Sequence, residues 1–436
     1  MRFKYQLYWL LAIGLLCSCQ QNNSATKHYA EFSIAEHLNP KIEGFEVQTI
    51  QEGEGEWLSI AKDPQGRLLV SPRNGKLLRF TIPTDKASNL KIDTLDIGIT
   101  DCQGLLYAYG HLYMMGQSVD TIRGIYRVPD LDGMGNYGEP ILMKEIPKNG
   151  DHSGHTLALG PDGMIYFLTG NENRPPKGED VSYVYEDWRN DHLMPLKSIF
   201  GVRQTPPGGY VMRTDKEGTK WQLMTYGLRN PYDMCFSPTG ELFTFDSDME
   251  WDFNLPWYRP TRVNHLVSGG DYAWRQSTAK RFDYYPDILP TLKEFGRGSP
   301  TATSFGTGAA FPAKYQEALF LGDWSYGKIY AMFIQPDGAS YTADYEAFIT
   351  GQPLNITDMI VGADGALYFT TGGNGTDTGL FRVTYNGKES TKPVKQKSEL
   401  HPNLILRRAL EQFHFAEDSS GLQLAFLFHW LSRFLS

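Results

Sequence analysis

The segment Gly160-Pro161-Asp162-Gly163, followed by Met164-Ile165-Tyr166-Phe167-Leu168, joins a tight turn to an apolar strand, and this pattern recurs along the chain. Pro at the second turn position fixes φ, and Gly supplies the positive φ that closes the hairpin. Three further clear copies and two weaker ones occupy residues 63–70, 237–245, 362–370, 109–114 and 318–323. Six units spaced by roughly 45 to 75 residues are typical of one four-stranded sheet per unit.

A sheet of this size cannot bury both of its faces by itself, whereas six such sheets stacked radially can. The sequence therefore predicts an all-β fold, a six-bladed β-propeller over residues 41–385. A β-sandwich or a string of small β domains is the alternative.

The composition agrees with many short strands. The 436 residues include 44 Gly, 25 Pro and 13% aromatic side chains, which suit strands joined by tight turns. A hydrophobic content of 41% excludes wholesale disorder. The 41 Lys+Arg and 50 Asp+Glu residues give a net charge of −9, and no basic tract is present, so a nucleic-acid partner is not expected.

The first residues read as a targeting signal. A short positive start precedes an apolar run, residues 5–16, which is too short to span a bilayer as a helix. The following Leu16-Cys17-Ser18-Cys19 resembles a bacterial lipobox. We therefore expect residues 1–18 to be a lipoprotein signal peptide, with acylation at Cys19, and residues 19–40 to form a tether. The protein would then be lipid-anchored to a membrane of a bacterial cell envelope; an ordinary secretory signal is the alternative.

The chain after the propeller changes character. Residues 386–399 are rich in Lys, Pro, Ser and Thr and are expected to be a linker. Leu404 to Leu410 and Leu422 to Leu435 favour a short C-terminal helical pair. Because the second helix would be apolar almost all round, the segment 400–436 looks truncated. The sequence does not decide whether the body's two cysteines, Cys102 and Cys235, pair.

The loop Gly150-Asp151-His152-Ser153-Gly154-His155 precedes the third turn–strand unit. Propeller ligand sites lie on loops at one mouth of the central channel. An imidazole on a Gly-flanked loop is free to point into that channel, and its ordinary pKa suits a general base. His152 is thus a candidate base. Two other interpretations remain open: His152 and His155 share a metal, or His152 bonds within its own turn.

The loop Gly227-Leu228-Arg229-Asn230-Pro231 carries a permanent cation. The planar guanidinium of Arg229 can stabilise an oxyanion or bind a carboxylate, although a structural bridge between blades is equally compatible.

A third loop, residues 246–252, holds four carboxylates. Asp246, Asp248 and Glu250 are candidate calcium ligands, and a solvated acidic loop is the alternative. The segment Asp130-Leu131-Asp132-Gly133-Met134-Gly135-Asn136 is a weaker calcium-loop candidate. The chain has no Gly-rich phosphate loop, no nucleophile elbow and no haem-attachment motif.

Residues from about 57 to 385 resemble the glucose/sorbosone dehydrogenases. The shared motifs are Asp151-His152 with the turn at Gly160, Gly227 to Pro231, and Val263-Asn264-His265 leading to Gly269-Gly270-Asp271-Tyr272-Ala273-Trp274. The segments 245–252 and 255–262 are similar to a branch of membrane-bound dehydrogenase-like bacterial lipoproteins. That family implies a six-bladed propeller with pyrroloquinoline quinone (PQQ) and calcium. Members of the branch commonly continue into helical repeats and a cytochrome c domain.

The resemblance implies roles for individual residues. His152, aided by Asp151, would remove the substrate's hydroxyl proton, and Arg229 would face the quinone oxygen. Asn230 and Asn171 would help to hold the cofactor. The family usually has an acidic residue at the position of Asn171.

Two further positions depart from the family. Where its quinone-binding members carry two arginines, this chain has Asn355 and Thr357. Because PQQ has three carboxylates, loss of those cations weakens the expectation that it binds.

Three functions follow from these patterns. The first is a lipid-anchored, quinone-dependent dehydrogenase that oxidises a sugar or related alcohol and passes electrons to a separate acceptor such as a cytochrome c. The second is a cofactor-free carbohydrate-binding propeller on the cell envelope. The third is a calcium-dependent lactonase-like hydrolase.

Overall fold

The computed structural model describes residues 32–83, 89–173, 180–181, 208–250, 255–274, 288–395 and 401–412. The chain divides into two compact units, and all six sheets belong to the unit made of Phe32–Thr81 and Ile92–Ser436, apart from Lys91 at the start of one strand. The other unit, Met1–Glu31 with Ile82–Lys91, lies mostly outside the described residues. Among the described helices, none has the length and apolar character that a membrane crossing requires.

Six sheets, here called blades 1 to 6, are antiparallel except for one short strand of blade 3, and their first strands follow one another along the chain. Blade 1 consists of β4 (Trp57–Lys62), β5 (Leu68–Pro72), β6 (Leu77–Thr81) and β7 (Lys91–Leu95). Blade 2 consists of β8 (Ile99–Ala108), β9 (His111–Ser118), β10 (Arg123–Pro129) and β11 (Ile141–Glu145). Blade 3 consists of β12 (Gly154–Leu159), β13 (Ile165–Thr169), β15 (Gly209–Thr214), β16 (Trp221–Leu228) and the parallel β14 (Asp180–Val181). Blade 4 consists of β17 (Met234–Phe236), β18 (Leu242–Asp246), β19 (Thr261–Leu266) and β20 (Lys293–Gly296). Blade 5 consists of β21 (Pro300–Phe305), β22 (Leu319–Asp323), β23 (Lys328–Asp337), β24 (Ser340–Gly351) and β2 (Leu38–Pro40). Blade 6 consists of β25 (Ile356–Val361), β26 (Leu367–Thr371), β27 (Thr378–Tyr385), β3 (Phe45–Gly53) and β1 (Ser33–Ile34).

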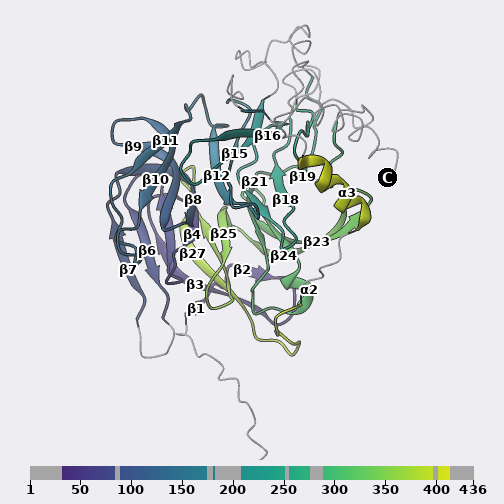
Figure 1. Ribbon diagram of the computed structural model, residues 1–436. Coiled ribbons are helices and arrows are strands. Elements are labelled where there is room, and N and C mark those ends of the chain that lie inside the picture. Colours follow the sequence, from purple (N-terminus) through teal and green to yellow (C-terminus); the bar gives the residue numbers. More distant parts are fainter. Residues whose placement is uncertain are drawn as a thin grey trace, which may run out of the picture. The chain divides into compact units, whose positions relative to one another are not determined.

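The first strands of the blades form a closed inner ring. β4, β8, β12, β17, β21 and β25 contact one another in this order, and β25 contacts β4 again. Figure 1 shows β8, β12, β21 and β25 in the middle of the view and β7 and β9 at its left edge. The ring is closed by β3, which precedes blade 1 in the sequence and pairs antiparallel with β27 of blade 6. The pairing runs from Thr378↔Gly53 to Tyr385↔Phe45. The prediction of an all-β, six-bladed β-propeller is therefore confirmed.

The recurring turn supplies a carboxylate that ties three strands together. In blade 3, Asp162 accepts hydrogen bonds from the Met164 amide (3.0 Å), the Tyr166 hydroxyl (2.9 Å) and Arg213 Nη1 (2.7 Å). In blade 6, Asp364 accepts the equivalent bonds from Ala366, Tyr368 and Arg382. The glycine that closes each of these two turns has a positive φ, 76° at Gly163 and 81° at Gly365. The pattern that predicts the fold thus also builds the hairpins.

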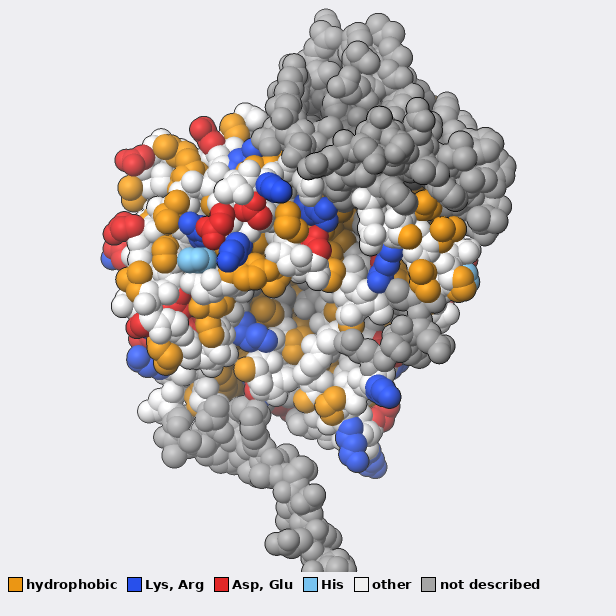
Figure 2. Space-filling view, viewed as in Figure 1, with side chains coloured by type: hydrophobic (Ala, Val, Ile, Leu, Met, Phe, Trp, Pro, Cys, Tyr) orange, Lys and Arg blue, Asp and Glu red, His pale blue; other side chains and the backbone are white. Residues whose placement is uncertain are grey.

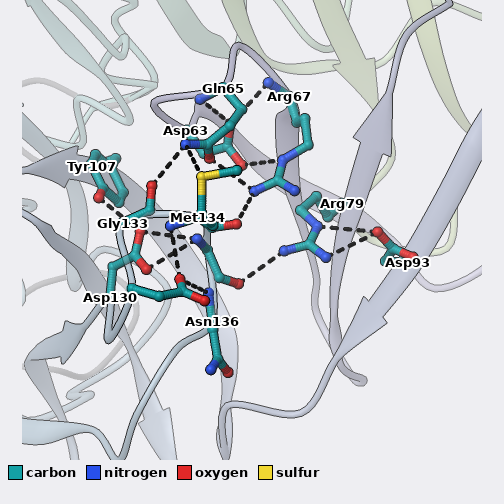
Figure 3. A network of polar contacts seen from close by, with 12 residues as sticks. Asp63, Gln65, Arg67, Arg79, Asp93, Tyr107, Asp130, Gly133, Met134 and Asn136 are labelled. Atoms are coloured by element: carbon teal, nitrogen blue, oxygen red, sulfur yellow. Dashed lines mark hydrogen bonds and ion pairs between the residues drawn. The ribbon is translucent and has the colours of Figure 1, made fainter.

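Blades 1 and 2 are joined through the loop 130–136, the weaker calcium-loop candidate. Asp130 accepts a hydrogen bond from the Gly135 amide within the loop. The carbonyl oxygens of residues 133–135 accept hydrogen bonds from Gln65 (2.7 Å), Arg67 (2.5 Å) and Arg79 (2.9 Å) of blade 1 (Figure 3). The loop therefore connects the two blades through its main-chain carbonyl oxygens.

Aromatic side chains fill the space between blades 5 and 6. Phe45 of β3 packs against Phe311, Tyr315, Phe348 and Tyr385, with ring centroids 4.7–5.0 Å apart. Burying one such ring contributes about 1.5–3 kcal/mol. The strand that closes the ring is thus held by packing as well as by its ladder of hydrogen bonds.

Besides the short α2 (Ala313–Gln316), the described part of the chain contains one longer helix, α3 (Pro402–Glu411), where the first C-terminal helix is predicted. The second predicted helix, 422–435, lies outside the described residues. α3 packs on blades 4 and 5: Arg407 and Arg408 bind Glu241, and Arg407 Nε donates to the Ala339 carbonyl (2.9 Å). Cys102 and Cys235 are both free thiols.

On the face seen in Figure 2, acidic and basic side chains of the described residues are intermixed rather than gathered by sign.

Candidate active site at the channel mouth

The predicted site residues lie at one end of the ring. His152 precedes β12, Asn171 follows β13, Arg229 follows β16 and Asp246 ends β18. Neighbouring strands of an antiparallel blade run in opposite directions. The first strand therefore begins on the side of the ring where the second and fourth strands end. We call this side, where first strands begin and second strands end, the site face.

Asn171 orients the His152 imidazole. His152 Nδ1 lies 2.6 Å from Asn171 Oδ1, and because a carbonyl oxygen only accepts, Nδ1 carries the proton in this arrangement. Nε2 then presents its lone pair, which is the form a general base needs. The His152 backbone amide donates to Glu172 Oε2 (2.7 Å), and the Glu172 amide donates back to the His152 carbonyl (3.2 Å).

Burial and the nearby Arg229 charge lower the pKa of His152, while the Asn171 hydrogen bond and the Glu172 and Glu250 carboxylates act in the opposite direction. The net lowering keeps the imidazole neutral at neutral pH, as a base must be. Asp151, predicted to assist His152, is exposed to solvent. Glu172, which sequence reasoning missed, holds the main chain of His152 instead.

Arg229 lies beside this histidine. Its backbone carbonyl accepts a hydrogen bond from the Asn171 amide (2.6 Å), so the two loops are joined directly. Its guanidinium donates to Ser247 Oγ (2.8 Å) and to both oxygens of Glu250 (3.0 and 2.8 Å). The loops that carry the imidazole and the guanidinium are thus joined on the site face, and the Arg229 charge acts on His152.

The acidic loop binds protein groups. Asp246 accepts hydrogen bonds from the amides of Arg229 (3.0 Å), Asn230 (2.9 Å) and Ser247 (2.9 Å). Asp248 accepts one from the Tyr258 hydroxyl (2.6 Å). Among the described residues, no three acidic, His or Cys side chains are grouped so as to hold a metal ion. The calcium prediction for Asp246, Asp248 and Glu250 stays a prediction, and the lactonase interpretation gains no support from this loop.

A second histidine forms a buried bridge. His155 Nδ1 lies 3.0 Å from Gln103 Oε1, and His155 Nε2 lies 2.8 Å from Asn230 Oδ1. Burial lowers the pKa of His155 to about 3, so the ring is neutral and has one N–H. One of the two amides must therefore turn its NH₂ toward the ring. His155 fixes Asn230, and the alternative of a metal shared by the two histidines gains no support here.

Positive charge at the site face gathers around Asp101. Lys148 Nζ and Arg123 Nη1 each lie 2.9 Å from Asp101 Oδ2, and Arg73 Nη1 lies 3.6 Å from Oδ1. Arg73 also pairs with Glu56. The side chains of Arg73 and Lys148 are 27% and 37% exposed, so both can reach a ligand.

The two positions that are arginine in quinone-binding relatives carry no charge here. Asn355 Nδ2 donates to the Trp324 carbonyl (2.9 Å), and the Thr357 hydroxyl bonds that of Thr370 (3.0 Å).

Two further carboxylates lie on inner strands or next to them: Asp233 is buried and Asp358 is half-buried. Asp233 accepts hydrogen bonds from the Thr303 amide (2.7 Å) and hydroxyl (3.0 Å), and Asp358 accepts them from Ser59 Oγ (2.8 Å) and the Ile60 amide (2.9 Å). Burial raises the pKa of Asp233 to about 6 and also raises that of Asp358, where repulsion by Asp233 adds to the effect.

The fold and these loops define a six-bladed propeller of the kind found in quinone-dependent sugar dehydrogenases. No protein-family model matches the chain. In sequence, it is 22% identical over 350 residues to the aldose sugar dehydrogenase YliI of Escherichia coli (strain K12), covering 76% of this chain and 82% of that protein. It is also 24% identical over 144 residues to quinoprotein glucose dehydrogenase B of Acinetobacter calcoaceticus, covering 30% of this chain but only 28% of that protein.

Among solved structures, the PQQ-bound aldose sugar dehydrogenase of Streptomyces coelicolor matches with a TM-score of 0.55 and 17% identity, covering 79% of this chain and 100% of that one. The chain is thus a six-bladed β-propeller similar to the quinoprotein glucose and aldose sugar dehydrogenases, as the sequence motifs predict.

Proposed function

We propose that the protein is a quinone-dependent dehydrogenase that oxidises a sugar or related alcohol. The observation that carries the proposal is that the His152 and Arg229 loops are joined on the site face: the Asn171 side chain bonds the His152 imidazole, and its main-chain amide donates to the Arg229 carbonyl. The similarity to sugar dehydrogenases supports the same conclusion.

The residues at the site face fit the charge of PQQ. Three cations share Asp101, and among the described residues only Arg73 has a second carboxylate, Glu56, so this group of described side chains is net positive. Arg73 and Lys148 would replace the missing arginines at 355 and 357 as carboxylate partners, and Arg229 with Asn230 would hold the quinone. When bound, the quinone supplies the acceptor for the hydrogen and electron pair that leave the substrate's C–H bond.

The chain's own residues would manage the proton and the charge. His152 Nε2 takes the proton of the substrate hydroxyl while Asn171 holds Nδ1–H, and a positioned base of this kind contributes roughly 10²–10⁴ in rate. Arg229 would stabilise negative charge that develops beside it. The imidazolium that forms has a neutral amide as its direct partner, so the carboxylates of Glu172 and Glu250 must supply its stabilisation.

Dye-linked turnover tests the proposal. Purified protein with PQQ and calcium should reduce an artificial acceptor in the presence of a sugar from a panel of aldoses, and His152→Ala should abolish this reduction while retaining the fold. Turnover that survives in His152→Ala would remove His152 as the base. Absence of turnover with every sugar, in a preparation that binds PQQ, would overturn the proposal.

The neutral side chains of Asn355 and Thr357 favour a second candidate, a carbohydrate-binding propeller without a cofactor. If the protein is such a propeller, calorimetry should show saturable sugar binding, and the protein should neither oxidise the sugar nor bind PQQ.

We further propose that the protein is attached to the cell envelope through Cys19 and passes electrons to a separate carrier such as a cytochrome c. The support is the lipobox-like sequence, which lies outside the described residues. Mass spectrometry of the mature protein should detect diacylglycerol at Cys19, and Cys19→Ser should release the protein from the membrane fraction.

A further inference from the structure

A cavity of about 370 Å³ opens on the site face at blade 6. It is built where β25 begins, β26 ends, β27 begins and β3 ends, so Asn355, Thr371, Thr378 and Gly53 line it together. Its volume falls within the range of about 300–1,000 Å³ that small-molecule sites occupy. None of the residues assigned to catalysis above lines it.

We propose that this cavity is a separate binding site for an uncharged or amino-substituted sugar residue. The proposal concerns binding only and does not depend on the dehydrogenase function.

The lining has the composition of a sugar site. Leu354 and Phe381 provide buried apolar surface, and Thr371 and Thr378, which are also buried, add hydroxyl groups beside it. A few placed polar groups on an apolar wall fix the orientation of a polyhydroxylated ligand. Asn355 adds an amide.

The cavity wall is held in place before any ligand arrives. Asn355 is held twice: its Nδ2 donates to the Trp324 carbonyl (2.9 Å), and its own carbonyl accepts from the Gly372 amide (3.0 Å). The loop after β26 is braced by hydrogen bonds from Thr376 to Gly373 and from the Gly375 amide to Glu56. A prearranged wall lowers the entropic cost of binding.

Charge selects the class of ligand. Two carboxylates, Glu52 and Asp377, line the cavity beside one imidazole, His37, and its lining includes no Lys or Arg. A carboxylated, phosphorylated or sulfated ligand would be repelled, whereas sugar hydroxyls and ammonium groups can donate to the two carboxylates. A metal ion is not favoured, because no group of three ligating side chains occurs among the described residues.

The test measures binding by saturation-transfer NMR on the full chain without added cofactor, using D-glucose, D-glucosamine and D-glucuronate. Glucose and glucosamine should bind and glucuronate should not. Thr378→Val, which keeps the shape but removes the hydroxyl, and Asp377→Asn, which removes one charge, should each weaken glucosamine binding about tenfold, the loss of roughly one hydrogen bond.

Two controls separate this site from the channel mouth. Asp344→Asn removes the same charge from a 95% exposed position in blade 5 and should leave binding unchanged. His152→Ala should also retain it, so loss of turnover and loss of cavity binding are distinguishable. Equal binding of glucuronate, or unchanged affinity in both Thr378→Val and Asp377→Asn with the fold intact, would overturn the proposal.

Discussion

At the scale of single residues, the partner of His152 decides the pH range of the site. Asn171 orients the imidazole but carries no charge, and burial with the Arg229 charge lowers the pKa of His152. The His152 imidazole therefore stays deprotonated to lower pH than an ordinary histidine would.

Replacing this amide by a carboxylate should raise the pKa of His152. An adjacent opposite charge shifts a pKa by about 1–3 units, so the acidic limb of the kcat/KM profile should move to higher pH in Asn171→Asp. NMR titration of His152 gives the same shift without turnover. Asn171→Ala serves as the control, because it removes the orienting group without adding charge. An unshifted titration in Asn171→Asp would show that Asn171 does not set this pKa.

The cations around Asp101 make a second residue-scale prediction. Lys148→Met and Arg73→Met should each weaken PQQ binding about tenfold, since each removes a partly exposed partner for a carboxylate. Fluorescence titration with PQQ measures the affinity directly. Lys76→Met, at a 55% exposed surface pair with Asp96, is the matched control. Unchanged affinity in both variants would mean that these cations do not hold the cofactor.

At the scale of elements, α3 is fastened to the face opposite the site face by a buried carboxylate. Glu241 accepts from Arg407 Nη2 (2.5 Å) and Arg408 Nε (2.6 Å), and it lies 2.7 Å from His265 Nε2. Burial alone would raise the pKa of Glu241, but the His265 hydrogen bond and the two arginine charges lower it to about 2.

A carboxylate with a lowered pKa stabilises the fold above its ordinary pKa, and this contribution is lost as the pH falls. The stability from Glu241 should therefore be complete above about pH 4.5 and disappear toward pH 2. Glu241→Gln should cost up to about 3–5 kcal/mol at neutral pH, because it removes the buried carboxylate that both arginines share, although Arg407 keeps its pair with Glu411. Urea unfolding at pH 7 and pH 3 measures both effects.

Asp96→Asn is the control for this pair of measurements. Its bridge to Lys76 is exposed to solvent, so the variant should be nearly as stable as the wild-type protein at both pH values. A Glu241→Gln variant as stable as the wild-type protein at pH 7 would mean that α3 is not anchored by this contact.

At the scale of the whole molecule, stability depends on closing the ring. β3 joins the start of the chain to its last blade, and Phe45 seats it among four aromatic rings of blades 5 and 6. Phe45→Ala should cost about 3–5 kcal/mol because it leaves a cavity in a packed core. Calorimetric unfolding would measure this cost, and Tyr345→Ala, at a 38% exposed position, should cost much less. Equal losses in the two variants would argue against closure as the source of stability.

The architecture could be predicted from the sequence because its signals are local. A turn such as Gly160 to Gly163 depends on residues next to one another, and six copies already imply six sheets. The His152 and Arg229 loops could be recognised for the same reason, as short motifs with a defined chemistry.

Other features depended on contacts between distant segments. Asn230 contacts His155, which lies 75 residues away in the sequence, and Asp358 accepts a hydrogen bond from Ser59, which lies 299 residues away. The role of Glu172, the binding of the acidic loop to Arg229 and main-chain amides, and the docking of α3 on Glu241 likewise arise only when the ring closes. The sequence alone determined the blades and the His152 and Arg229 loops, since short-range turn chemistry encodes them. The tertiary structure alone decided which charges meet, since closure of the ring sets the neighbours of each charge.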